Sequence, residues 1–232
     1  MQALPGKARL RPWVLAGRRV RRGELRLADF AYGQPSFSQF GEDRVLEQIF
    51  SDQDEGFFVD VGAFAPVHIS NTYLLYRRGW RGINLEPNPG AIAEFRRLRP
   101  RDISLPVAVS EIDGDVDYLV KGTFSGIADA RHQWGQDGDR VLVRSRRLES
   151  ILDEHLPAGQ PVDLLDVDCE GHDLVVLQSN NWDKCRPRVV LAEWHEGEHV
   201  RDYLASKGYR LYAQLRMTGI YLDAGDPLCA AA

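Results

Sequence analysis

The sequence predicts an α/β domain built on a mostly parallel β-sheet with helices on both of its faces. Short apolar segments of strand length alternate with helical segments along the chain, and this alternation is typical of doubly wound sheets. The last two apolar segments, residues 209–215 and 219–222, are joined by a short turn, which predicts that the sheet ends in an antiparallel pair.

Length and composition fit one soluble domain with a short appendage. The chain has 232 residues, of which 44% are hydrophobic and 27% are charged. No apolar run approaches the roughly 20 residues that a membrane-spanning helix needs, and the N-terminus lacks the apolar core of a secretory signal. The three cysteines have no metal-type spacing, which favours a reduced, cytoplasmic setting. We therefore expect one cytoplasmic domain over residues 34–232.

Charge is distributed unevenly along the chain. Residues 1–23 contain basic side chains and no acid, whereas the whole chain has a net charge of −5. The body is therefore strongly acidic, which argues against a domain that wraps nucleic acid. Residues 1–33 are expected to form a basic arm. This arm is either a poorly ordered, solubilising terminus or a segment that makes weak contact with an anionic membrane surface or a partner.

The first half of the predicted domain alternates helix and strand. In its first helix Val45, Leu46 and Ile49 share one face, as packing against a sheet requires. Gly79 ends the second helix and Pro100 ends the third. The expected elements are helix 42–50, strand 57–61, helix 73–78, strand 83–85 and helix 91–98.

The second half continues the alternation after a third strand. Pro106 lies inside that strand and places it at a sheet edge or bends it. Thr123 and Ser125 belong to a turn that is expected to fold over a ligand site at the carboxyl ends of the strands. The expected elements are strands 103–110, 115–120 and 141–146, helix 148–155, strand 162–167, helix 173–178, strand 187–194, helix 200–207 and the two closing strands.

Asp60, Gly62 and Glu86 lie where the first two strands end. Ligands of open α/β sheets bind outside the carboxyl ends of the strands, and an acid at the second strand's end can accept hydrogen bonds from two ribose hydroxyls. We therefore predict a nucleoside-containing cofactor here. The alternative is that Asp60 only caps the turn and that Glu86 is merely exposed. The loop after Gly62 lacks a GxGxxG fingerprint, which weighs against nicotinamide or flavin cofactors.

A second polar cluster follows the strand at 162–167 and contains Asp166, Asp168, Glu170 and His172. Buried carboxylates without partners are costly, so such a cluster usually meets a cation, a donor-rich ligand or a catalytic task. His172 can accept a proton near neutral pH. The alternative interpretation is that the acids cap the next helix and pair with arginines.

Glu193 and His195 follow the next strand of the predicted sheet. Neighbouring strands lie about 5 Å apart, so these two residues and Asp168 can share a divalent cation such as Mg²⁺. A solvated polar loop explains the same residues equally well.

Four segments in combination resemble the FkbM family of S-adenosylmethionine-dependent methyltransferases. The resemblance runs from about residue 36 to about residue 193, and it implies a Rossmann-like, seven-stranded fold. It also implies methyl transfer, mostly to hydroxyl oxygens of sugars in glycans, glycolipids or natural products. The segments are SQFGED (38–43), FFVDVGA (57–63) with SNTYLLYRRGWRGINLEPNP (70–89), LPVAVS (105–110) and DLLDVDCEGHDLVVLQSNNW (163–182).

The resemblance implies a role for each matching position in holding S-adenosylmethionine. Asp60 and Gly62 match the motif that holds the amino-acid part of the cofactor, and Glu86 matches the acid that binds the ribose. Ala108 and Val109 fall where the family packs the adenine. The cofactor-binding prediction further includes Ala63, Asn71 and Pro87.

Two further motifs complete the implied site. Gln39 and Glu42 lie in the element that closes over the cofactor. Asp168, Glu170 and Gly171 match the family's DxEG, which lies beside the transferring methyl, so that Asp168 belongs to both the cofactor-binding and the catalytic set.

Two departures from the family's pattern concern Gly62 and Asp166. The loop after Gly62 has no second glycine. This absence affects how the loop can bind the carboxylate of the cofactor's methionine part. Asp166 stands where many relatives have a small polar residue, and it implies either an altered polar network or a metal.

The mechanistic hypothesis is that Asp168 or His172, with Glu170 beside them, removes a proton from an acceptor hydroxyl. Glu193 and His195 would orient a small-molecule or glycan acceptor, with or without a divalent ion. Methylation of a carboxylate or a peptide group is one alternative. A non-catalytic module that binds the cofactor and serves a partner is another.

Overall fold

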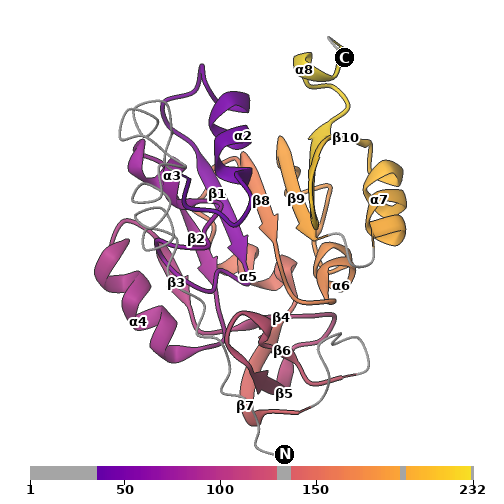
Figure 1. Ribbon diagram of the computed structural model, residues 1–232. Helices are drawn as coiled ribbons and strands as arrows, with labels where there is room; N and C mark the ends of the chain where they lie inside the picture. The colour runs from indigo at the N-terminus through magenta and orange to yellow at the C-terminus, as the bar shows by residue number, and fades with distance from the viewer. Residues whose placement is uncertain (1–35, 130–136, 194–196, 231–232) are drawn as a thin grey trace, which may run out of the picture. The chain divides into compact units, whose positions relative to one another are not determined.

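Seven strands form one twisted sheet within residues 36–129, 137–193 and 197–230, which are the residues that the computed structural model describes (Figure 1). Their order is β10-β11-β9-β8-β1-β2-β3, and only β11 runs antiparallel to its neighbours. The strands are β1 (Phe57–Val61), β2 (Arg81–Leu85), β3 (Ile103–Leu105), β8 (Leu164–Val167), β9 (Val189–Glu193), β10 (Tyr209–Leu215) and β11 (Thr218–Asp223). The predicted fold class is confirmed, whereas the predicted arm at 1–33 lies outside the described residues.

Strand β1 lies in the middle of the sheet and pairs with β2 on one side and with β8 on the other. The chain therefore leaves β1 in one direction first and later returns to its other side. Such a reversal of strand order opens a crevice at the carboxyl ends of the two central strands. This edge of the sheet is where a ligand is expected.

Helices cover both faces of the sheet, as the alternation of apolar residues requires. On β1, Phe57, Val59 and Val61 pack in one core with α5, α6 and α7, whereas Phe58 packs in a second core with α2 and α3. The helices are α2 (Glu42–Ile49), α3 (Tyr73–Arg77), α4 (Pro89–Leu98), α5 (Leu148–His155), α6 (Asp173–Gln178), α7 (Gly197–Ser206) and the short α8 (Pro227–Ala230). None of these helices is long and apolar enough to cross a membrane.

A second, smaller sheet lies beyond the carboxyl ends of the central strands, at the bottom of Figure 1. It is inserted between β3 and α5 and has the order β4-β7-β5-β6. Its strands are β4 (Ala108–Val109), β5 (Gly114–Val120), β6 (Gly126–Ile127) and β7 (Asp139–Arg146), and the 3₁₀ turn η2 (Gly122–Phe124) connects β5 to β6. This sheet was not predicted.

The single strand predicted over residues 103–110 is wrong. The structure divides it into β3, at the edge of the large sheet, and β4, in the small sheet. Pro106 separates the two strands because it has no N–H to continue a ladder of hydrogen bonds. The break redirects the chain from one sheet to the other.

Candidate active site

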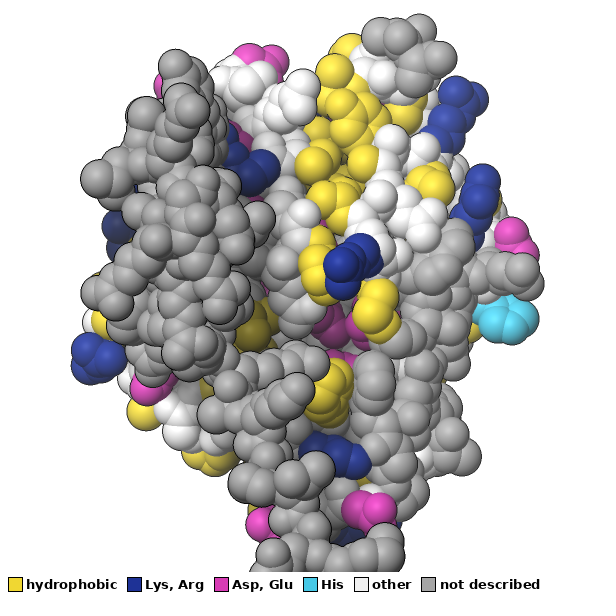
Figure 2. Space-filling model, viewed as in Figure 1, with side chains coloured by type: hydrophobic (Ala, Val, Ile, Leu, Met, Phe, Trp, Pro, Cys, Tyr) yellow, Lys and Arg dark blue, Asp and Glu magenta, His cyan; other side chains and the backbone are white. Residues whose placement is uncertain are grey.

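A cavity of about 400 Å³ lies between the carboxyl ends of the central strands and the small sheet. Its volume falls within the range typical of small-molecule sites. In the view of Figure 2, acidic side chains are recessed near the middle of the molecule, between hydrophobic side chains. The structure brings together on its wall six residues predicted for the site, namely Gln39, Gly62, Glu86, Pro87, Asp168 and Glu170.

A narrower cavity of about 30 Å³ adjoins the large one and shares Gly62, Pro87, Tyr118 and Ser125 with it. Most of its wall is apolar, and it includes Ala108 and Val109, which were predicted to pack an adenine. An apolar wall of this kind suits contact with a nucleobase ring. The two cavities together follow the edge of the sheet from β2 to β8.

Glu86 is held at the edge of the large cavity by two backbone amides. The N–H of Phe64 donates to its Oε2 at 3.1 Å, and the N–H of Asn88 donates to its Oε1 at 2.8 Å. Each carboxylate oxygen has a further lone pair, so Glu86 can still accept two hydroxyl groups. Burial raises the pKa of Glu86 to about 7, against the opposing effect of the two amides.

Gly62 allows the loops after β1 and β8 to touch. Its φ is +80°, and a Cβ atom at this position would overlap the carbonyl oxygen of Asp168. The N–H of Gly62 donates to Leu85 at 2.9 Å, and the N–H of Asp168 donates to Val61 at 3.0 Å. These bonds hold Gly62 between the ends of β2 and β8, so the glycine permits close packing of backbone as well as access for a ligand.

Asp60 lies behind the cavity wall, on the face of β1 that α2 and α3 cover. Its carboxylate accepts a hydrogen bond from the Thr72 hydroxyl at 2.6 Å. The fully buried Arg99 donates to that same hydroxyl at 3.0 Å and forms an ion pair with Asp102 at 2.7 Å. Burial raises the pKa of Asp60, and Arg99 opposes this shift. Asp60 therefore contributes to the site through a buried network.

Asp166 lies opposite Asp60 in the register of β1 and β8 and is also buried. The Asn71 side-chain amide donates to it at 3.3 Å. Burial, followed by the charges of Asp60 and Asp168, raises the pKa of Asp166 well above its usual value. Asn71 thus lies behind the wall as a partner of Asp166, and Glu42 adds another nearby charge.

Asp168 is exposed toward the large cavity, and neighbouring protein atoms and acidic groups crowd its carboxylate. This desolvation, followed by the charges of Asp173 and Glu170, raises the pKa of Asp168 well above its usual value. Glu193 comes next to Asp168 because Val167 pairs with Ala192. Burial and then Asp168 raise the pKa of Glu193 to about 10.

The predicted metal set was Asp168, Glu193 and His195. His195 lies outside the described residues, and within the described ranges no group of three or more His, Cys, Asp or Glu side chains is arranged to hold a metal. Asp168 and Glu193 come together as strand neighbours. A carboxylate pair of this kind can share a proton, which the raised pKa values of both groups favour.

The structure separates His172 from Asp168. His172 is buried on the wall of the narrow cavity, beside Ala108 and Val109, and its Nε2 lies 3.1 Å from the carboxylate of Asp129. Asp168 and Glu170 face the large cavity instead. The two candidate bases therefore line different cavities, and Asp168 lies in the larger one.

Strained backbone gathers around the large cavity. Phe64, Ile69 and Glu170 line it with φ values of 49°, 55° and 52°, and among the described non-glycine residues only Arg216 is also left-handed. Such conformations cost free energy, particularly for a β-branched residue such as Ile69, and they concentrate at functional sites. No residue pattern in the chain predicts this strain.

The small sheet supplies the opposite wall, which sequence reasoning missed apart from the turn at 122–126. Tyr118, Val120, Val141 and Val143 line the cavity, together with Thr123 and Ser125 of the turn. Their alternation along two segments was visible in the sequence. The alternation predicted strands in these two segments, but no residue pattern indicated that the strands would face the cavity.

Fold and site define a class of protein: a seven-stranded sheet in this order, with one antiparallel strand and a cavity at its central carboxyl edge, is the class I methyltransferase fold. The family model described as "Methyltransferase FkbM domain" matches residues 60–211, well over half of the chain. The chain therefore belongs to the FkbM family of S-adenosylmethionine-dependent methyltransferases, and the resemblance of its motifs is confirmed.

Solved structures with related folds are distant in sequence. A TehB-like SAM-dependent methyltransferase from Corynebacterium glutamicum is 11% identical, with 91% of this chain and 96% of that chain covered and a TM-score of 0.41. An O-methyltransferase from Bacillus cereus in complex with SAH is 12% identical, with 90% of this chain and 94% of that chain covered and a TM-score of 0.45. No curated protein matches the chain. These similarities are too distant to carry a conclusion about the acceptor.

Proposed function

We propose that the protein transfers a methyl group from S-adenosylmethionine to a hydroxyl oxygen of a sugar-containing acceptor, in a glycan, a glycolipid or a glycosylated natural product. The observation that carries this proposal is the presence of Glu86 and Asp168 in one cavity. Glu86 can accept the hydroxyls of a ribose, and Asp168 can accept the proton of an alcohol. A hydroxyl acceptor needs such a base because it must lose its proton as it is methylated.

The residues of the site fit the cofactor. Glu86 would hold the ribose through the two acceptor positions that its backbone partners leave open. Ala108 and Val109 would pack the adenine in the narrow cavity. Asp60 and Asp166 lie behind the cavity wall, and their hydrogen bonds with Thr72 and Asn71 would hold the loop after Gly62 in place for the methionine part of the cofactor.

When bound, S-adenosylmethionine supplies a methyl group on a positively charged sulfur. An acceptor oxygen can bond to the methyl carbon in line with the carbon–sulfur bond, and the sulfur leaves as S-adenosylhomocysteine. The chain has to bring an acceptor oxygen to about 3–3.5 Å from the reacting carbon and to remove its proton. We assign the proton to a carboxylate oxygen of Asp168. Its raised pKa makes it a stronger base, once it is ionised, than an aspartate with an ordinary pKa. Glu170 would orient the acceptor from the same wall.

Two measurements test this proposal in sequence. Calorimetry with S-adenosylhomocysteine measures binding of the cofactor product, and mass spectrometry then follows methylation across a panel of sugars, alcohols, carboxylates and peptides. Products methylated on hydroxyl oxygen are expected. Methylation of only carboxylates or peptides would refute the assignment of the acceptor, and binding without any turnover would indicate a non-catalytic module.

Replacement of Glu86 by Gln is expected to weaken S-adenosylhomocysteine binding about 10- to 100-fold, because hydrogen bonds to a charged acceptor are lost. The wild-type affinity should also fall as the pH decreases below about 7, by up to about tenfold per pH unit. The reason is that Glu86 has a pKa of about 7 and must lose its proton to accept both hydroxyls. Calorimetry between pH 5.5 and 8.5 measures both effects.

Glu94 on α4 provides the matched control, since it is an exposed glutamate outside both cavities. Glu94→Gln should keep the wild-type affinity and its pH dependence. If Glu86→Gln binds as tightly as the wild type at pH 8, Glu86 does not hold the ribose.

A further inference from the structure

Exposed apolar side chains of this protein gather in the large cavity. Nine large hydrophobic residues are exposed among those that the structure describes, and four of them line this cavity: Ile69, Val120, Val141 and Leu142. Val120 and Val141 are 42% and 43% exposed. Scattered exposed hydrophobic residues need no explanation, but a cluster inside a cavity indicates an apolar ligand surface.

The register of the small sheet explains which side chains form this surface. Tyr118 pairs with Val141, and Val116 pairs with Val143, so these four side chains share one face of the β5–β7 ladder with Val120. The residues that alternate with them lie on the other face, which carries the charged side chains of Asp115, Asp117, Arg140 and Arg144 but also Leu119 and Leu142. Asp139 is the one charged residue of the ladder on the valine face, and it lies at the end of the ladder beside Val120. The sheet therefore turns its apolar face to the cavity.

This apolar face is distinct from the surface that suits the cofactor. The nucleoside-binding side of the site is formed by the ends of β1 and β2, with Gly62, Glu86 and the narrow cavity. The valines come from the small sheet, and none of these valines lines the narrow cavity, to which the inserted segment contributes Tyr118, Ser125 and the residues of β4 and β6. Between the two walls lie Asp168 and Glu170, the groups that would meet the acceptor hydroxyl.

We infer that the acceptor carries an apolar portion, such as an alkyl or acyl chain or a hydrocarbon ring system, next to the hydroxyl that receives the methyl group. This inference rests on the proposed function and narrows its substrate class to amphipathic acceptors. The apolar portion packs against Val120, Val141 and Val143, while the polar portion faces Asp168 and Glu170. A purely polar glycan would leave the valine face in contact with water, without the gain from burial.

Binding of n-alkyl β-D-glucosides tests the inference. Methyl, hexyl and octyl glucoside are titrated by calorimetry into the protein saturated with S-adenosylhomocysteine, at concentrations below micelle formation. Burial of each methylene contributes about 0.8 kcal/mol at most, so affinity should rise about two- to fourfold per methylene group until the wall is covered. Equal affinity for the three glucosides, or no binding of any of them, overturns the inference.

A double variant, Val120→Thr with Val141→Thr, links the effect to this wall. Threonine keeps the shape and strand preference of valine but adds a hydroxyl, and both positions are exposed, so the fold should be retained. The gain per methylene should fall below about 1.5-fold. Ile112→Thr is the matched control, because Ile112 is 55% exposed and lies outside the cavity.

The results separate this inference from the proposed function. Loss of chain-length dependence in the double variant, but not in Ile112→Thr, supports the apolar acceptor wall. The same dependence in all three proteins overturns it while leaving the methyl-transfer proposal intact. A wild-type protein that does not bind S-adenosylhomocysteine would instead overturn the proposed function, and this inference with it.

Discussion

Replacement of Gly62 by Ala is expected to lower the free energy of unfolding by about 2–5 kcal/mol. Two costs add: about 1–2 kcal/mol for a side chain at a left-handed φ, and about 1–3 kcal/mol for displacing packed atoms. The second cost arises because the new Cβ would overlap the carbonyl oxygen of Asp168, which is backbone and cannot rotate away. Urea denaturation measures the change, which is a large share of the total stability of about 5–15 kcal/mol.

Gly159 separates the two costs. Its φ of +73° is close to that of Gly62, but a Cβ there would have no atom within 4 Å. Gly159→Ala should therefore lose only the conformational cost of about 1–2 kcal/mol. Equal losses in the two variants would contradict the close packing of the β1 and β8 loops and leave Gly62 as an ordinary turn glycine.

The elements predicted most accurately are those whose signals are local. Helices α5 and α6 match their predicted bounds to the residue, because apolar spacing and a terminating residue lie within each segment. The meeting of Glu86 and Asp168 in one cavity also followed from a general property of parallel sheets, whose carboxyl ends share one edge.

The small sheet could not be predicted because its pairings join distant segments. β5 pairs with β7 across the turn η2 and β6, and β4 pairs with β7, some 37 residues further along the chain (Ala108 with Ser145). The alternation in these segments fits any half-buried strand, and it does not specify a partner or a sheet. The apolar wall of the cavity was missed for this reason.

The position of His172 depends on backbone that the sequence does not reveal. Glu170 and Gly171 have φ values of 52° and 100°, so two consecutive left-handed residues turn the chain between Asp168 and His172. Glycine at 171 permits such a turn, but a left-handed glutamate is unexpected. The turn sends His172 to the narrow cavity, whereas helical spacing would have placed the two side chains side by side.

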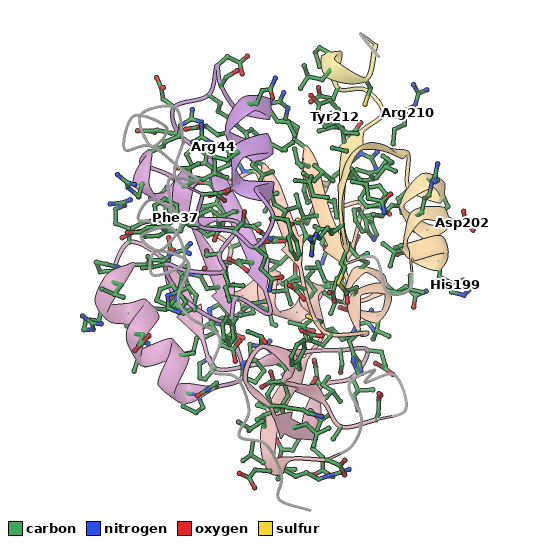
Figure 3. All side chains as sticks on the ribbon, viewed as in Figure 1. Phe37, Arg44, His199, Asp202, Arg210 and Tyr212 are labelled. Atoms are coloured by element: carbon green, nitrogen blue, oxygen red, sulfur yellow. The ribbon has the colours of Figure 1, made fainter. Side chains whose placement is uncertain are left out.

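Some side chains lie far from the site, as the labelled residues in Figure 3 illustrate. His199 and Asp202 of α7 and Arg210 of β10 lie toward the outer edge, away from the small sheet. His199 is exposed, although it follows Glu193 by only six positions in the sequence. Proximity along a loop is therefore a weak guide to shared chemistry here.

Replacement of Asp168 by Asn is expected to reduce kcat by about 10²- to 10⁴-fold with any acceptor that the wild-type protein methylates, because the amide cannot take the hydroxyl proton. The variant removes one charge from a crowded group of carboxylates, so it should remain folded. Calorimetry with S-adenosylhomocysteine checks this independently of turnover. A near-normal kcat would remove Asp168 as the base.

Glu170→Gln distinguishes a base at Asp168 from one at Glu170. The charge of Glu170 raises the pKa of Asp168, so its removal should lower that pKa. The base is active when ionised, and wild-type kcat should therefore rise with pH through the pKa of Asp168. In Glu170→Gln this rise should move to lower pH, whereas Asp168→Asn should remove it altogether. If Glu170→Gln removes the rise and Asp168→Asn only displaces it, Glu170 is the base and Asp168 its neighbour.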